Sequence, residues 1–243
     1  MLEKVATIMV EDLDEVLALK ASAKSARDDK EWEGAISDLE EAIDLLEERM
    51  PEVPTRAPSW LKAELADTYG MMGGIQRRWA LLLNGGDRQR HLAMSVAAYD
   101  EGFRYEQDLQ PNDASTYNRI NRLVGRVLLD PHVLQEDGDT ASEVAEELRK
   151  AEEILTEQIG SARQKDPWGY CDLGTIRLLR GTPDALLTFY ELDRLRPPAF
   201  VYDSALATLE PLCEVASDLR PDLAQAVAQL RRSARYVDQP SSR

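Results

Sequence analysis

Three stretches of the chain repeat one arrangement of small and large apolar residues that ends at a proline. In each copy a small residue lies four positions before a large apolar one on the same helical face, and a third residue follows three positions later. The copies are Ala35, Leu39, Ala42 and Pro51; Ser95, Tyr99, Gly102 and Pro111; and Ala185, Phe189, Leu192 and Pro197. Small residues at this spacing let a neighbouring helix approach closely, so the pattern predicts stacked helical hairpins.

Almost every other segment also predicts helix. β-branched residues are sparse, and no alternating run of them is bounded by turn residues as a strand would need. We expect ten helices that pair into five hairpins and form one all-α domain over residues 1–243. The expected hairpins cover residues 12–51, 59–111, 113–161, 166–197 and 199–237.

Polar residues and prolines mark several of the expected helix starts. The predicted N-caps are Ser59, Thr140 (in a capping box with Glu143), Asp166 and Thr182, and residues 111–113 start a further helix. Inside the helix after Ser59, Gly70, Gly73 and Gly74 each cost about 1 kcal/mol of helix propensity relative to alanine. Glycines kept at that cost predict a close helix–helix seam. A phosphate-binding loop would need a preceding strand and a Lys-Ser or Lys-Thr pair, which these glycines lack.

The formal net charge of −16 is unevenly distributed. Residues 1–55 hold sixteen acidic and six basic side chains, while the last 25 residues hold five arginines and two aspartates. A strongly acidic chain repels phosphates and anionic membranes, so generic binding to nucleic acid or to such membranes is not expected. The acidic stretch is read as a solvated helix face, with a docking surface for a basic partner as the alternative.

No apolar run is long enough to span a bilayer, and the N-terminus turns acidic too soon for a secretory signal. A cytoplasmic location is therefore expected. Cys171 and Cys213 lie in apolar helical patterns, which favours buried small side chains over a disulfide or a redox pair.

The segment 168–197 carries Leu173-Gly174, Ala185, Phe189 and Pro197 in order. This resembles the tetratricopeptide (TPR-like) superfamily, whose consensus has Leu-Gly, alanine, phenylalanine and proline at nearly these spacings. The hairpins at 12–51 and 59–111 match mainly in their second helices. The resemblance implies an α-α superhelix, a TPR-like solenoid that binds a protein or peptide in its concave groove.

Two shorter segments, 117–121 (Tyr-Asn-Arg-Ile-Asn) and 166–168 (Asp-Pro-Trp), look like the helical TRAF-binding region of apoptosis-signalling MAP kinase kinase kinases and its bacterial relatives. That narrower resemblance implies a regulatory, protein-binding domain that works beside a signalling enzyme. No kinase or protease sequence accompanies it in this chain.

Arg119, Arg122 and Arg126 recur at spacings of three and four, with Asn118 beside them. If Tyr117 and Ile120 face the core, then Asn118 and Arg122 point into the groove and Arg119 and Arg126 line its edge. Guanidinium and amide groups there could bind a carboxylate or a phosphate. The alternative is a solvated stripe that pairs with acids such as those of residues 143–153.

A second basic cluster surrounds the predicted turn at residues 84–86. Arg77 and Arg78 precede this turn, and Arg88, Arg90 and His91 follow it. Such a cluster beside an exposed aromatic residue can bind anions or nucleic acid. The alternative packs Trp79 between the two helices and pairs the arginines with nearby acids.

Catalytic and metal-binding patterns are missing from the sequence. His91 and His132 have no partner at a zinc or iron spacing, and no serine or cysteine lies in a nucleophile motif. We therefore expect neither an enzyme nor a cofactor. The function predicted is a protein–protein interaction scaffold or regulatory module in a cytoplasmic signalling or stress/defence system. Its expected partner is a protein or peptide, with an effector enzyme and, in a homodimer, a second copy of the chain as candidates. The alternative is a sensor that binds a small anion such as a nucleotide through its arginines.

Overall fold

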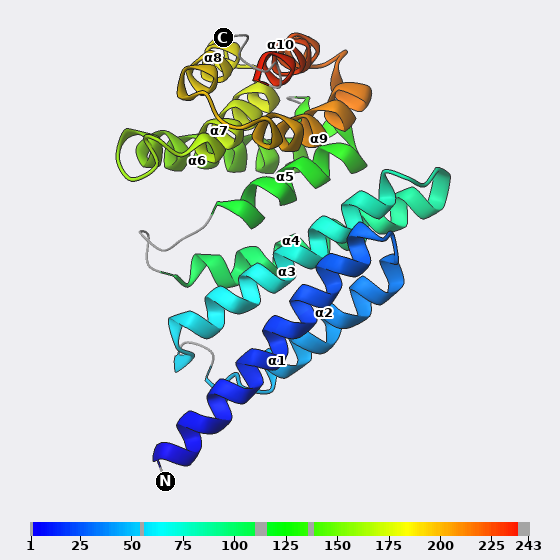
Figure 1. Cartoon of the computed structure of the whole chain (residues 1–243). Helices are drawn as coiled ribbons and strands as arrows, with labels where there is room; N and C mark the ends of the chain where they lie inside the picture. Colours follow the sequence, from blue (N-terminus) through cyan, green and yellow to red (C-terminus); the bar gives the residue numbers. More distant parts are fainter. Residues whose placement is uncertain (1, 54–55, 110–115, 136–138, 238–243) are drawn as a thin grey trace, which may run out of the picture. The chain divides into compact units, whose positions relative to one another are not determined.

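The structure is a computed structural model that describes residues 2–53, 56–109, 116–135 and 139–237 (Figure 1). These residues form ten α-helices and contain no strand, as expected. The helices are α1 (Leu2–Asp28), α2 (Trp32–Glu47), α3 (Ser59–Ala80), α4 (Gly85–Gln107), α5 (Tyr117–Leu129), α6 (Asp139–Gly160), α7 (Pro167–Arg180), α8 (Ala185–Leu195), α9 (Ala199–Ala216) and α10 (Asp222–Val237), with a 3-10 turn η2 (Pro131–Leu134).

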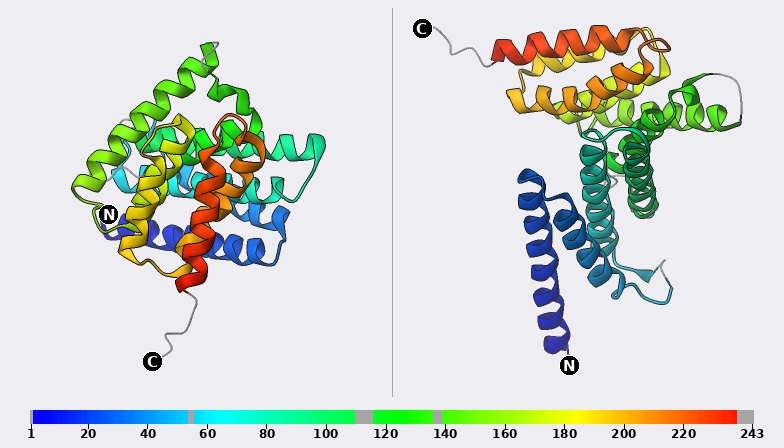
Figure 2. Two further views of the ribbon diagram at one scale, coloured as in Figure 1. Left: turned by 90° about the horizontal axis from the view of Figure 1, so that it is seen from above. Right: turned by 90° about the vertical axis from the view of Figure 1, so that its right-hand side faces the viewer.

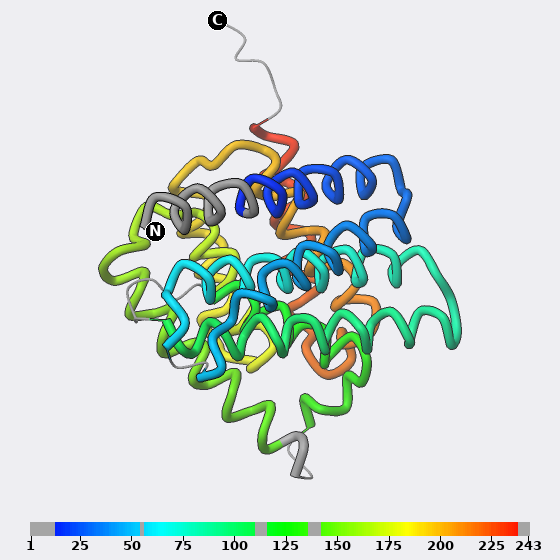
Figure 3. Tube along the Cα trace, turned by 90° about the horizontal axis from the view of Figure 1, so that it is seen from below, coloured from blue at the N-terminus to red at the C-terminus, as the bar shows by residue number. Residues whose placement is uncertain are grey.

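The chain divides into two compact units, Met1–Gly125 and Arg126–Arg243. We call them the N-terminal unit and the C-terminal unit and describe each by itself. The N-terminal unit packs α1 on α2, α2 on α3 and α3 on α4. Figure 2 shows α1 and α2 running side by side, and Figure 3 shows α3 and α4 joined by the short turn at residues 81–84.

The C-terminal unit packs α7 against α6, α8 and α9, and α10 against both α8 and α9. Four of the five expected hairpins are therefore packed helix pairs: α1–α2, α3–α4, α7–α8 and α9–α10. The expected hairpin at 113–161 runs across the boundary between the two units, because the boundary falls inside α5. That hairpin and the single domain over 1–243 stay predictions.

The repeated small–large pattern forms the core, as expected. All nine of its helical positions are buried, and Ala35, Leu39, Tyr99, Phe189 and Leu192 show no measurable exposure. Two of the three closing prolines can be placed. Pro51 and Pro197 follow the ends of α2 and α8, and Pro111 lies outside the described residues.

The glycines of α3 form the predicted seam, because large side chains fill the space where their own would be. A Cβ built at Gly73 would lie 2.9 Å from the ring of Tyr99, and one at Gly70 would lie 2.8 Å from Oδ1 of Asn118. Such distances are too short for any real side chain. The C-terminal unit has the same kind of contact, in which a large ring packs directly on a glycine. A Cβ at Gly174 would lie 2.5 Å from Cζ of Phe189.

Some helix starts differ from the prediction. Asp166 caps α7 as expected, accepting a hydrogen bond from the Trp168 amide at 3.0 Å. Ser59 is wrong as a cap, because it is already the first residue of α3 and the cap position is Pro58, which has no side-chain donor or acceptor. Thr182 is also wrong, because residues 182–184 form a turn and α8 starts at Ala185. The side chain of Thr140 and residues 111–113 lie outside what the structure describes.

The first helix starts at Leu2 rather than at residue 12. Residues 2–11 contain neither glycine nor proline, so no residue there interrupts the helix. Cys171 is buried, as expected, and burial raises the pKa of its thiol to about 12. Cys213 is only half-buried, and neither cysteine forms a disulfide.

Candidate functional site

Asn118 lies inside the N-terminal unit, so the expectation that it points into a groove is wrong. Its side chain is 1% exposed. Of the two residues that this expectation assumed to face the core, Ile120 is 4% exposed but Tyr117 is 48% exposed. Asn118 occupies the gap left by Gly70 of α3 and Gly102 of α4, where added Cβ atoms would lie 2.8 and 2.6 Å from it. The two glycines set the rotation of α5 by accepting the small amide.

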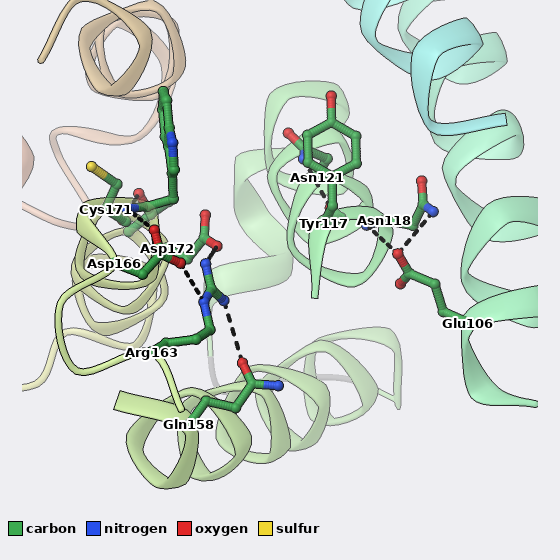
Figure 4. A network of polar contacts seen from close by, with 11 residues as sticks. Glu106, Tyr117, Asn118, Asn121, Gln158, Arg163, Asp166, Cys171 and Asp172 are labelled. Atoms are coloured by element: carbon green, nitrogen blue, oxygen red, sulfur yellow. Dashed lines mark hydrogen bonds and ion pairs between the residues drawn. The ribbon is translucent and has the colours of Figure 1, made fainter. Parts of the chain in front are cut away.

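Hydrogen bonds hold Asn118 in this gap (Figure 4). Its Nδ2 donates to the carbonyl oxygen of Ala66 at 2.9 Å and to Oε1 of Glu106 at 3.0 Å, and its backbone N–H donates to the same Oε1 at 3.2 Å. Glu106 is itself 3% exposed. The amide therefore gives a buried carboxylate part of the hydrogen bonding that burial requires.

Arg122 is also buried, contrary to expectation. It is 7% exposed, and its Nη1 pairs with Oδ1 of Asp100 at 3.0 Å. Its guanidinium carbon lies 4.4 Å from the ring centre of Phe103, and that of Arg119 lies 4.7 Å from the same centre. Cation–π contacts with α4 thus hold both arginines, because the aromatic ring attracts each cation.

Arg126 belongs to the C-terminal unit and pairs with acids of α6. Its Nη1 lies 3.4 Å from Glu143 and 3.7 Å from Glu147. The alternative interpretation, a solvated stripe that pairs with acids of residues 143–153, predicts this pairing. The row of residues 118–126 is therefore largely engaged inside the protein, and a binding role for Asn118, Arg119, Arg122 and Arg126 stays a prediction.

Arg77 and Arg78 lie at the end of α3 and differ in their exposure and in their contacts. Arg77 is half-buried, and its Nη1 donates to Oδ1 of Asn121 at 2.7 Å. Arg78 is exposed. In the part of the chain that the structure describes, no carboxylate lies within ion-pair distance of either arginine. Two neighbouring cations without an acid are unusual in a chain of net charge −16.

Arg27, at the end of α1, adds a third positive charge to this region. Partial desolvation, followed by the nearby charges of Arg27 and Arg77, lowers the pKa of Arg78 from its ordinary value. Arg27 itself pairs with Asp28 at 2.6 Å. Like charges held together raise the local positive potential, which favours an anion.

Two tyrosines lie beside the arginines. The rings of Tyr99 and Tyr117 meet edge to face with centres 6.0 Å apart, and the guanidinium carbon of Arg77 lies 5.9 Å from the Tyr99 ring centre. A Cβ built at Gly74 would lie 3.5 Å from both hydroxyl oxygens. Tyr117 is thus a half-exposed ring next to the cations, and Asn121 is a buried amide that contacts Arg77.

We call Arg27, Arg77, Arg78, Tyr117 and Asn121 the arginine–tyrosine site. Guanidinium groups can bind phosphate or carboxylate through two parallel hydrogen bonds, and a half-exposed ring can stack on a planar group. The sequence predicted Arg77 and Arg78 as binding residues but not the other three. The i, i+4 spacing of Tyr117 and Asn121 was the available signal, since it places both on one face of α5.

His91 and Trp79 explain the rest of the basic cluster. The His91 ring lies 4.0 Å from the Trp79 ring, centre to centre, so Trp79 packs between α3 and α4 as our alternative expected. Nδ1 of His91 is 2.7 Å from Oε1 of Gln76, and the histidine is 4% exposed. Burial, with a smaller effect from Arg90, lowers the pKa of His91 below its ordinary 6.5.

This burial predicts an acid sensitivity of the N-terminal unit. His91 must be neutral in the fold but binds a proton more readily in the unfolded chain, so its contribution to stability is complete above pH 6.5 and is lost as the pH falls. We expect the thermal midpoint to fall between pH 7.5 and 5.5, and to fall less in His91→Phe. Differential scanning calorimetry of both proteins measures this. Equal pH slopes would contradict it, and His132→Phe, at an exposed position, is the matched control.

A second polar network lies within the C-terminal unit (Figure 4). Arg163 pairs with Asp166 at 2.6 Å and with Asp172 at 3.3 Å, and its Nη1 donates to Gln158 at 3.3 Å. Because Asp166 also caps α7, this network fixes the start of that helix and the position of Trp168.

In the described ranges, no three His, Cys, Asp or Glu side chains gather as a metal site requires. Nor does any helix there have the length and apolar character needed to cross a membrane.

Comparison with family models gives one match, Tetratricopeptide Repeats-Sensor (TPR-S), over residues 1–129. The match covers the whole N-terminal unit and so contains the arginine–tyrosine site. Comparisons with curated proteins and with solved structures give no match. Repeats of this type are generally non-catalytic and serve in protein interaction or sensing.

Proposed function

Because the chain belongs to the Tetratricopeptide Repeats-Sensor family, we propose that its N-terminal unit is a sensing module that binds a small anion with a planar part, such as a nucleotide, at the arginine–tyrosine site. The single observation that carries the proposal is the pair Arg77 and Arg78, to which the described residues supply no carboxylate partner. In an acidic chain, a ligand anion is the natural partner for these two cations.

The surroundings of the pair support a ligand with two chemical parts. Arg77 is already held by its hydrogen bond to Asn121, so its side chain loses less conformational freedom when it binds an anion. Arg78 is exposed and can meet a phosphate or carboxylate directly. The half-exposed Tyr117 ring offers a face for a base or another planar group. The scaffold role that the sequence predicted would use the same two arginines. The ligand would then be an acidic peptide instead of a nucleotide.

Ligand-induced thermal stabilisation tests the proposal. We expect a panel of nucleotides to raise the melting temperature of the native protein, with inorganic phosphate weaker and adenosine weaker still. Arg78→Ala should weaken the affinity for the strongest nucleotide about tenfold to a hundredfold, the value of one charge-assisted contact. Arg90→Ala is the matched control, because Arg90 is exposed and pairs only with Asp87 at 3.4 Å in the described structure.

Tyr117→Ala separates the two parts of the site. It should weaken nucleotide binding while leaving phosphate binding unchanged, because only the ring contact is lost. Isothermal titration calorimetry measures both affinities. If no anion stabilises the protein beyond sodium chloride of equal ionic strength, or if Arg78→Ala and Arg90→Ala behave alike, the sensing proposal is wrong.

A further inference from the structure

Two large aromatic side chains lie exposed and side by side in the C-terminal unit. Trp168 of α7 is 39% exposed and Phe200 of α9 is 61% exposed, and their ring centres are 6.1 Å apart. A tryptophan and a phenylalanine that pack on each other at the surface form one contiguous apolar patch, unlike scattered single residues. Neither residue lies within the family match, so this surface is independent of the arginine–tyrosine site.

Both aromatic residues are held firmly by the backbone. The Trp168 amide donates to Asp166, which Arg163 pins at 2.6 Å, and Pro167 occupies the first position of α7. Phe200 follows Pro197 and Pro198, and Pro198 is the cap residue of α9. Rigid aromatic residues lose little conformational entropy on binding, which is why they dominate binding energy at protein interfaces.

The exposed face of α9 continues from Phe200 with small and acidic residues. Asp203, Ser204, Ala207 and Glu214 are all exposed at helical spacing from Phe200. No cation of the described chain lies within ion-pair distance of Asp203 or Glu214. Glu210, on the same side, pairs with Arg231 at 2.7 Å. The face therefore begins with the apolar ring of Phe200 and has a small side chain, Ala207, at its middle. An unpaired carboxylate lies on each side of Ala207 along the helix.

We propose that this face, which we call the aromatic–acidic face, docks a basic peptide segment of a partner protein. An apolar side chain of the segment packs on Trp168 and Phe200, and lysine or arginine side chains pair with Asp203 and Glu214. From Phe200 the two acids lie about 4.5 and 21 Å along the helix axis, at about 1.5 Å per residue. The segment therefore carries one anchor and basic residues both next to it and farther along.

Charge decides between the possible partners. An acidic peptide or an anionic membrane would bring like charges against Asp203 and Glu214, at a cost that grows as water is excluded. A basic segment gains from both acids and also from the aromatic rings, which attract cations over their faces. The rings supply the affinity and the acids supply the selectivity.

Random-peptide display against the native full-length chain tests this proposal. We expect the selected peptides to carry one aromatic or aliphatic residue with lysines or arginines around it. The Trp168→Ala/Phe200→Ala double variant should bind them at least about thirtyfold more weakly, as expected for removal of hot-spot aromatics. Asp203→Lys/Glu214→Lys should weaken them and reduce the salt dependence. Glu157→Lys, a charge reversal at an exposed position of α6, should change little.

Circular dichroism and the thermal midpoint of each variant show that the fold is kept, since the substituted side chains are exposed. The proposal is overturned if the selected peptides are acidic, if no peptide prefers the native protein over the double variant, or if Glu157→Lys has the same effect as the α9 reversals. Analytical ultracentrifugation covers the remaining occupant. Self-association that Phe200→Asp abolishes would assign the face to a second copy of the chain instead.

Discussion

Replacing Asn118 by aspartate is expected to lower the stability of the N-terminal unit by about 3–5 kcal/mol, the cost of an uncompensated charge in the interior. The new carboxylate would take the place of an amide that donates to Glu106 at 3.0 Å and to the Ala66 carbonyl at 2.9 Å. Both donations would be lost, and two carboxylates would face each other in a closed space. Urea unfolding followed by circular dichroism measures the loss.

The pH dependence of this variant has a definite sign. Two facing carboxylates must share a proton in the fold, so their folded pKa values rise above those of the unfolded chain. The penalty is therefore small near pH 4 and grows as the pH rises toward 8.

Asn121→Asp is the matched control for Asn118→Asp. Its new carboxylate would accept from Arg77, which already donates to Asn121 Oδ1 at 2.7 Å. Aspartate at this position would lose the donation of Asn121 Nδ2 to the Tyr117 carbonyl oxygen at 2.8 Å but would gain an ion pair with Arg77. Stability should therefore fall much less than in Asn118→Asp, whereas nucleotide binding should weaken because the cation is neutralised. If both variants destabilise equally, the role we give to Asn118 is wrong.

Phe189→Ala is expected to destabilise the C-terminal unit by about 3–5 kcal/mol, because it opens a cavity in a packed core. Phe189 is fully buried, and its ring occupies the space above Gly174. Gly174→Ala fails for the opposite reason, since its Cβ would lie 2.5 Å from Cζ of Phe189. Overpacking of this kind costs about 1–3 kcal/mol, against a gain of about 1 kcal/mol in helix propensity.

The two substitutions should not add. When Phe189→Leu removes the ring edge, Gly174→Ala should lose most of its cost and can become favourable. A double-mutant cycle measured by urea unfolding gives the coupling between the two sites. Additive effects within about 0.5 kcal/mol would contradict the contact. Gly160→Ala is a matched control, because a Cβ there meets nothing within 4 Å.

The repeated pattern of small and large apolar residues predicted the architecture well. The spacing correctly predicts which positions are buried, among them Ala35, Leu39, Ser95 and Tyr99. Residues at this spacing lie on the same face of a helix, and that face packs against the core. The glycines of α3 also predicted their seam, since only close packing explains their cost. Both the burial pattern and the close packing at the glycines can therefore be predicted from short stretches of sequence.

The rotation of α5 could not be predicted in the same way. Hydrophobicity favoured Tyr117 as the core residue and Asn118 as the exposed one, and the structure reverses them. The reason is tertiary. Gly70 and Gly102 are far apart in the sequence, yet together they make one gap that the Asn118 amide fills. The same rotation buries Arg122, whose guanidinium carbon lies 4.4 Å from the ring centre of Phe103.

The adjacency of Tyr117 and Asn118 in the chain bears on the proposed sensing function. Tyr117 is a half-exposed ring in the arginine–tyrosine site, and the Asn118 side chain packs between two glycines of different helices. The two residues are adjacent in the chain, so a bound ligand that displaced the Tyr117 ring would also act on the position of Asn118. Tightly packed contacts do not stretch gradually but change between discrete arrangements. If the arginine–tyrosine site binds a ligand as proposed, its occupancy would therefore be coupled to whether Asn118 stays between the two glycines.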